Sequence, residues 1–397
     1  MYYLTKAIIF KGVILLSNRT TDHIRPRGVL SRMKPYSPGK PIWEVQRELG
    51  IDKVTKLASN ENPIGPSPLA VQAIQSYLTD IHRYPDADTI DLCSAIAGKL
   101  EVLPEQVLVT NGADELITLL SETFLEEGDE VIVPSPTFSE YEFGANLMGA
   151  SVVQVPLRED YRYEIADLLA AVTEKTKLLY ICSPNNPTGT YMTKQDLHAL
   201  MDKLPPHVLV IFDGAYSHFV TADDYCDGLE LVRQGYPIIV TQTFSKIYGL
   251  AGIRVGYGIA SASILRNIRQ VKEPFNVNAL AQVGATAAIQ DDAHLEATRE
   301  MNKLGREQLY SSLQELGFNF TRSMSNFVLV ELGPDAKAIY DQLMRKGVIL
   351  RYAGAWNLPN HVRISIGTPE DHEAFISALR EVLQESKEQP LLSALKD

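Results

Sequence analysis

Cysteine is scarce in this chain, which has three in 397 residues: Cys93, Cys182 and Cys226. The three lie far apart, and none stands near histidines at the spacing of a metal site. This pattern argues against a fold held by disulfides and against a zinc site. We therefore expect reduced thiols, a cytoplasmic location and no bound metal.

The chain also lacks a dense run of lysine or arginine, and its formal net charge is -12. Proteins that bind nucleic acid usually carry a basic stripe, so we expect no nucleic-acid partner. A regulatory protein that senses amino acids and binds DNA is disfavoured for the same reason. The residues ahead of the folded region are also too few for a helix-turn-helix domain.

No hydrophobic run near the N-terminus is long enough to span a bilayer. The apolar stretch at residues 7–16 is short and is interrupted by Lys11. Because no clear small-residue cleavage site follows it, we interpret residues 1–30 as an N-terminal extension, with a secretory signal as the alternative. We expect no membrane partner.

What the chain does contain is a series of short apolar runs that alternate with helical patterns. The runs cover residues 107–109, 130–133, 178–182, 208–212 and 236–240. Buried strands alternating with helices predict an α/β fold with a mostly parallel central sheet covered on both faces. Ligands bind beyond the carboxyl ends of the strands in such sheets, and polar clusters follow these runs.

The last third of the chain has a different pattern. Residues 292–316 predict one long, charged helix that connects two parts of the protein. Strands and a last helix are then predicted at 326–332, 347–350, 362–366 and 371–385. We expect a large domain at 60–295 and a smaller α+β domain made of 31–59 and 296–397, a division that suits this chain length.

Lys246 follows the apolar run 236–240 at a predicted strand end. A lysine deprived of solvent can lose its proton and attack a carbonyl, as in Schiff-base enzymes. Thr243 and Ser245 precede it and Arg254 follows it. Hydroxyls and an arginine are the groups that a phosphate needs. The pattern therefore predicts a cofactor with an aldehyde and a phosphate, pyridoxal 5'-phosphate.

Asp213 ends an almost wholly apolar run, and a buried carboxylate needs a cationic partner. A protonated pyridine nitrogen would serve, whereas a helix N-cap is the alternative. Tyr216 could bind the phenolic oxygen of the same ring or belong to the core. Asn186 could donate to that oxygen; its segment is turn-rich, but a turn explains the proline and glycine there and not the polar amide.

Three further features have both a functional and an ordinary interpretation. Ala113 and Asp114 open a predicted helix, where free amides can bind an anion or simply form a turn. Phe138 could stack on an aromatic ring or be a core residue. Arg363 lies within an apolar strand, so a substrate anion or a fixed ion pair must partner it; Arg351 is a weaker case of the same kind.

The order and spacing of these residues resemble the class I/II, fold type I aminotransferases dependent on pyridoxal phosphate, over about residues 36–383. Within them the chain is most similar to the histidinol-phosphate aminotransferases. The segments that support this are 34–41, 57–63, 83–86, 183–190 and 362–368.

The resemblance implies a role for each residue of the set. Lys246 would hold the cofactor covalently and then move a proton at the substrate Cα. Asp213 would pair with the pyridine nitrogen, and Tyr216 and Asn186 with the phenolic oxygen. The phosphate would be surrounded by Ala113, Asp114, Thr243, Ser245 and Arg254, and the ring would stack on Phe138.

The resemblance also implies how substrates and subunits meet. Arg363, helped by Arg351, would bind the anionic group of a small-molecule amino donor or of a 2-oxo acid. Asn62 would line the entrance. Tyr84 would reach the phosphate from the neighbouring subunit, which implies a homodimer.

The implied reaction is transamination of L-histidinol phosphate with 2-oxoglutarate in histidine biosynthesis. Two residues depart from the family pattern. Ile64 stands near the substrate where many members have tyrosine, and Gly214 replaces an acidic residue after Asp213. Ile64 speaks for the alternative of an aromatic amino acid aminotransferase of broad specificity. A decarboxylase of O-phosphothreonine is the third possibility.

Overall fold

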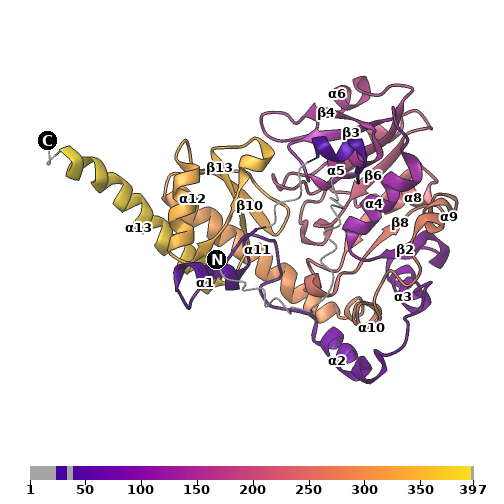
Figure 1. The fold of residues 1–397 in the computed structure, drawn as a ribbon, viewed down its shortest axis with the longest axis horizontal. Helices are drawn as coiled ribbons and strands as arrows, with labels where there is room; N and C mark the ends of the chain where they lie inside the picture. Colours follow the sequence, from indigo (N-terminus) through magenta and orange to yellow (C-terminus); the bar gives the residue numbers. More distant parts are fainter. Residues whose placement is uncertain (1–23, 34–38, 395–397) are drawn as a thin grey trace, which may run out of the picture.

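The computed structural model describes residues 24–33 and 39–394, with side chains up to residue 385 of the last helix. Most of the expected N-terminal extension, and residues 34–38 of the family segment, therefore lie outside the described residues. Two bodies of different size are joined by the long helix α11, Asp292–Glu315 (Figure 1).

A seven-stranded sheet forms the centre of the larger body, with the strand order β2-β8-β7-β6-β5-β3-β4. The strands are β2 (Val107–Thr110), β3 (Glu130–Ser135), β4 (Ser151–Pro156), β5 (Thr176–Cys182), β6 (Leu209–Asp213), β7 (Ile238–Thr243) and β8 (Gly256–Ile259). All pairs are parallel except those of β8, which runs antiparallel to both β2 and β7. The predicted α/β class and mostly parallel sheet are confirmed.

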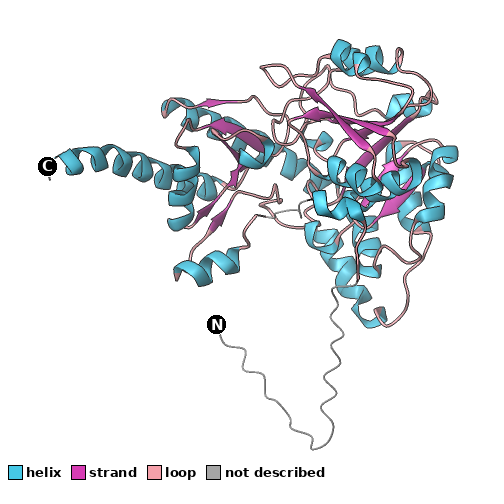
Figure 2. Ribbon diagram, turned by 45° about the horizontal axis from the view of Figure 1, so that its top comes forward, coloured by secondary structure: helices cyan, strands magenta, loops and turns pink. Residues whose placement is uncertain are grey.

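Helices cover both faces of this sheet, as Figure 2 shows. One face packs on α4 (Ala113–Phe124), α5 (Glu140–Met148) and α9 (Ala262–Val271). The other packs on α2 (Pro68–Tyr77), α3 (Ile90–Leu100), α6 (Ile165–Ala170), α7 (Lys194–Met201), α8 (Leu229–Arg233) and α10 (Ala279–Ala288). Leu209 and Ile211 face the first layer while Val210 and Phe212 face the second, which is why the strands read as continuous apolar runs.

The smaller body has an antiparallel sheet with the order β12-β13-β10-β9 and a separate parallel pair, β1-β11. The strands are β1 (Thr55–Lys56), β9 (Asn319–Phe320), β10 (Phe327–Glu331), β11 (Val348–Ile349), β12 (Arg351–Tyr352) and β13 (His361–Ser365). Its helices are α1 (Ile42–Leu49), α12 (Ala336–Arg345) and α13 (Pro369–Ala394). The domain boundaries at 59/60 and 295/296 remain our proposal, supported by a separate cluster of buried side chains here.

Short 3-10 helices complete the described chain at Gly28–Arg32 (η2), Leu78–Asp80 (η3), Pro104–Gln106 (η4), Ser217–Phe219 (η5), Ala251–Ile253 (η6) and Ala353–Trp356 (η7). None of the helices in residues 24–33 and 39–394 is long and apolar enough to cross a membrane.

Two strands of the larger sheet do not stand out in the sequence. β4 is a sheet edge with several exposed residues, so it has no continuous apolar run. β8 reads Gly-Tyr-Gly-Ile, a weak strand pattern. Gly258 is closely packed, since a Cβ there would lie 2.7 Å from Cδ2 of the buried Leu116 and would have to displace it. Tertiary contacts, not local preference, make this segment a strand.

Candidate active site

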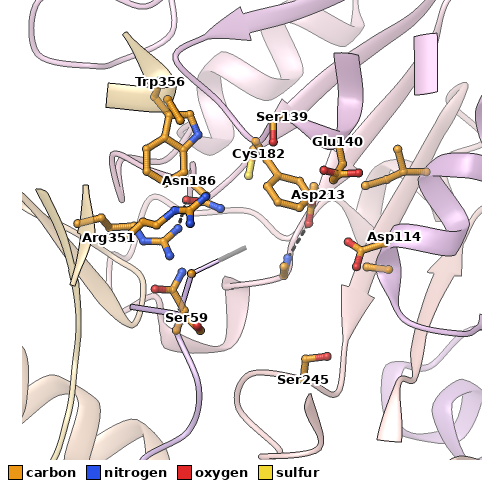
Figure 3. Close-up of a pocket in the computed structure, with 18 of the residues that line it drawn as sticks. Ser59, Asp114, Ser139, Glu140, Cys182, Asn186, Asp213, Ser245, Arg351 and Trp356 are labelled. Carbon is orange, nitrogen blue, oxygen red and sulfur yellow. Dashed lines mark hydrogen bonds between the residues drawn. The ribbon is translucent and has the colours of Figure 1, made fainter. Parts of the chain in front are cut away.

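A pocket of about 870 Å³ lies at the carboxyl ends of the parallel strands and is closed on the other side by the smaller body. It brings together most of the predicted site residues: Ala113, Asp114, Phe138, Asn186, Asp213, Tyr216, Thr243, Ser245, Lys246, Arg254, Arg351 and Arg363. Figure 3 shows Asp114 and Asp213 on one side of the pocket and Arg351 and Trp356 on the other.

Lys246 follows the end of β7 and lines the pocket. Its Nζ donates to the carbonyl of Ser59 at 3.3 Å and lies 5.8 Å from the ring centroid of Tyr216. Loss of solvent, and then the positive charge of Arg363, lower the pKa of Lys246 from 10.5 to about 8. An appreciable fraction of the amine is therefore neutral near pH 7, as nucleophilic attack on an aldehyde requires.

Asp213 is the last residue of β6 and is buried. Its Oδ2 accepts a hydrogen bond from the Tyr141 hydroxyl at 2.5 Å, and its Oδ1 accepts one from the Ala215 backbone at 3.0 Å. Burial raises the pKa of Asp213, and the hydrogen bond from Tyr141 opposes that rise. A buried carboxylate at a pocket wall fits a cationic ring nitrogen, since no lysine or arginine is hydrogen-bonded to it among the described residues.

Asn186 and Tyr216 line the same pocket as Asp213. The Tyr216 hydroxyl accepts a hydrogen bond from Asn60 Nδ2 at 3.1 Å. Oδ1 of Asn186 accepts one from Nη1 of Arg363 at 2.5 Å. With Oδ1 engaged in this way, Nδ2 of Asn186 is the atom that would donate to a phenolic oxygen.

A cup for an anion forms where α4 begins. Ala113 and Asp114 are its first two residues, and the first amides of a helix have no partner within the helix. Nη2 of Arg254 lies 3.0 Å from Oδ2 of Asp114, and its Nη1 lies 3.4 Å from Oγ of Ser245. Thr243 adds a second hydroxyl, 3.0 Å from the Ser245 backbone nitrogen. Amides, hydroxyls and a guanidinium together suit a phosphate ester.

Gly112 shows how closely this cup is packed. It precedes α4 with φ of +80°, and a Cβ there would lie 2.4 Å from Nη2 of Arg254. Gly256, the first residue of β8, is equally restricted, because a Cβ there would lie 2.6 Å from the Ala113 nitrogen. Only glycine permits this approach of the arginine to the helix N-terminus.

Three predicted residues lie outside the lining of this pocket. Tyr84 is 82% exposed and stacks on Phe275 with ring centroids 4.8 Å apart. Asn62 donates to the Ile247 carbonyl at 2.9 Å and to the Thr298 hydroxyl at 3.2 Å, so it ties the segment after Lys246 to α11. Ile64 is exposed on the surface of the single chain.

The sequence interpretation missed three residues that the structure brings to the pocket or its wall. Tyr141 binds Asp213, Asn60 binds Tyr216, and Trp356 lies beside the arginines. Asn60 belongs to the segment 57–63 singled out above. Tyr141 and Trp356 have no local signal, because an aromatic residue in a helix or a turn is ordinarily explained by packing. Within the described chain, no cluster of three or more His, Cys, Asp or Glu could hold a metal ion.

Known proteins are similar to this chain in both sequence and fold. The family model for aminotransferase class I and II matches residues 52–379. A histidinol-phosphate aminotransferase of Moorella thermoacetica is 48% identical over 90% of this chain and 92% of its own length. One of Symbiobacterium thermophilum is 42% identical over 90% and 99%.

A solved structure extends the similarity to three dimensions. The histidinol-phosphate aminotransferase of Sinorhizobium meliloti in complex with pyridoxal-5'-phosphate superposes with a TM-score of 0.84 and 27% identity. The match covers 91% of this chain and 98% of that one.

Proposed function

The chain belongs to the class I and II aminotransferases, and from this premise we propose that it transfers the amino group of L-histidinol phosphate to 2-oxoglutarate. The products are imidazole acetol phosphate and L-glutamate, a step of histidine biosynthesis. The relatives at 48% and 42% identity are named for this activity, and they align over nine tenths of the chain.

The cofactor is pyridoxal 5'-phosphate, which the Sinorhizobium meliloti relative binds. The residues of the pocket fit it at each functional group: an anion cup, a buried carboxylate, a hydroxyl-amide pair and a lysine. When bound, the group supplies a ring that withdraws electrons from the substrate Cα. The observation that carries the proposal is the convergence of Lys246, Asp213 and Arg254 in one pocket.

Each of these side chains has a defined task. Lys246 would hold the cofactor covalently and, as a free amine, would move a proton at the substrate Cα. Asp213 stabilises positive charge on the ring nitrogen. Tyr216 and Asn186 orient the ring by its phenolic oxygen, and Phe138 supports one ring face.

The cup of Ala113, Asp114, Thr243, Ser245 and Arg254 holds the phosphate. Arg363 and Arg351, on the wall opposite Asp213, bind the anionic group of either substrate. Because one pair serves both the phosphate of the donor and a carboxylate of the acceptor, the two half-reactions use a single site. Asn62 stays a proposed residue of the entrance, acting through the backbone that it holds beside Lys246.

We also propose a cytoplasmic homodimer in which Tyr84 completes the site of the partner. Tyr84 lies outside its own pocket and stacks on Phe275, which is exposed as well, as are the apolar side chains of Ile64 and Ile81. Large exposed apolar groups of this kind mark protein interfaces. Mixing Tyr84→Phe subunits with Lys246→Ala subunits tests this: hybrid dimers with one intact site should regain activity, and no regain would contradict the shared site.

A substrate panel with 2-oxoglutarate as the acceptor tests the reaction. We expect kcat/KM for histidinol phosphate to exceed that for phenylalanine and tyrosine. The opposite preference would establish the aromatic aminotransferase that Ile64 favours. Carbon dioxide released from O-phosphothreonine, without glutamate formation, would establish the decarboxylase.

A further inference from the structure

Two arginines of the pocket wall face each other across a strand pair. Arg351 of β12 and Arg363 of β13 are direct partners in the antiparallel register. Side chains of such a pair project from the same face of the sheet, a few ångströms apart. Because like charges directly opposite one another repel, another contact must offset this arrangement.

Trp356, at the end of η7, is one residue that contacts both arginines. Its ring centroid lies 5.7 Å from Cζ of Arg351 and 5.3 Å from Cζ of Arg363. Both distances fall within the range in which an aromatic face attracts a cation. Figure 3 shows the indole beside Arg351 at the pocket wall. One ring therefore serves two cations.

The two arginines are not equally embedded. Arg363 is buried, its Cζ also lies 5.2 Å from the ring centroid of Phe327, and its Nη2 donates to the Ala58 carbonyl at 2.7 Å. Arg351 is partly exposed and belongs to a two-residue strand at the sheet edge. Removal of the indole should therefore displace Arg351 more than Arg363.

The ligands that these arginines would bind differ in what they require. A carboxylate has two oxygens and one charge, which a single guanidinium satisfies by a bidentate pair. A phosphate monoester has three free oxygens and nearly two charges, so it benefits from a second guanidinium. A contact that keeps both arginines together therefore favours binding of a phosphate monoester over a carboxylate.

We propose that Trp356 is a positioning residue that holds Arg351 and Arg363 against one aromatic face and so sets the preference for a phosphate monoester over a carboxylate. The inference rests on the proposed function in one respect: histidinol phosphate is taken as the phosphate-bearing donor.

The test compares Trp356→Leu with Trp356→Phe in the holoenzyme. In Trp356→Leu we expect the KM for histidinol phosphate to rise about tenfold, as for loss of a partly desolvated cation–π contact. The kcat should stay within about twofold, and the KM for glutamate in the reverse direction should change far less. Trp356→Phe should restore most of the preference, because it keeps an aromatic face.

A second measurement does not depend on which donor is turned over. Phenethyl phosphate and 3-phenylpropionate have no amino group and differ chiefly in the anion. We expect Trp356→Leu to weaken inhibition by the phosphate about tenfold more than inhibition by the carboxylate. Equal losses, no loss, or a Phe variant as impaired as the Leu variant would overturn the role of Trp356. If wild type fails to turn over histidinol phosphate but the inhibitor preference shifts as stated, the donor assignment alone is wrong.

Discussion

The hydroxyl of Tyr141 lies 2.5 Å from Oδ2 of Asp213, and the Tyr141 side chain is completely buried. The same ring stacks on Tyr180 at 4.4 Å and meets Phe138 edge-on at 5.6 Å. One tyrosine therefore contacts both the proposed partner of the cofactor nitrogen and the proposed support of its ring. This contact fixes the direction of the carboxylate without an ion pair.

Replacing Tyr141 with phenylalanine should raise the pKa of Asp213 further, because the hydrogen bond that opposes the effect of burial is lost. We expect cofactor affinity and kcat to fall about tenfold, the factor for one hydrogen bond to a charged group. Titration of the apoprotein with cofactor and steady-state kinetics measure both. Tyr163→Phe is the matched control: its buried hydroxyl donates to the Cys182 carbonyl, so its loss should spare both quantities.

Lys246→Ala should remove both the covalent anchor and the proton-transferring amine. We expect turnover to fall by at least about a thousandfold and the visible absorption of lysine-bound cofactor to disappear. Lys303→Ala removes an exposed lysine of α11 and should behave as wild type. Near-normal turnover by Lys246→Ala would refute the assignment of this residue.

The lowered pKa of Lys246 predicts the pH dependence of cofactor capture. Because the neutral amine attacks, the rate constant of the apoprotein should rise with pH through about 8 and level off above it. Rapid mixing of apoprotein and cofactor, followed by absorbance, measures this. A midpoint near the ordinary value of 10.5 would show that Lys246 is not deprived of solvent.

Arg363 variants provide a control for this prediction, since its charge contributes to the shift. Arg363→Lys should leave the midpoint near its wild-type value, whereas Arg363→Gln should raise it.

The lowered pKa of Lys246 also predicts how the stability of the apoprotein depends on pH. Between pH 8 and 10.5 the unfolded chain binds more protons at Lys246 than the folded apoprotein does, so this residue makes the free energy of unfolding rise with pH there.

Gly112→Ala should displace Arg254 from the anion cup, because the added Cβ would lie 2.4 Å from its Nη2. We expect cofactor affinity to fall at least about tenfold, in addition to backbone strain of about 1–2 kcal/mol. Gly128→Ala separates the two effects: its φ is +97°, but no atom lies within 4 Å of the added group. It should lower thermal stability and leave cofactor affinity unchanged.

The residues at the ends of parallel strands were predictable because their position follows from the sheet alone. Asp213 ends β6 and Lys246 follows β7, and neighbouring parallel strands end at the same edge. Arg363 was recognisable as a guanidinium within an apolar strand. The long helix from Asp292 was predictable from its charge pattern and length.

Contacts between distant segments could not be predicted in the same way. Tyr141 meets Asp213 across two layers, and Asn60 reaches Tyr216 from a segment that precedes the whole larger sheet. Trp356 owes its position to the pairing of β12 with β13, and the two-residue β12 has no signal of its own in the sequence. Tyr84 faces solvent in the single chain, so its proposed role depends on a second subunit.

Strand β8 has a consequence for the order of folding. It is the one neighbour of β2 in the described sheet, and β3 to β7 are synthesised between them. Gly256 is in register with both Thr110 and Thr243, so the two halves of the anion cup meet only when β8 inserts. Such long-range closure is a slow step. The apoprotein must complete the sheet before it can bind the phosphate. Bound cofactor should then stabilise the pairing of β8 with β2 and β7 and slow its opening.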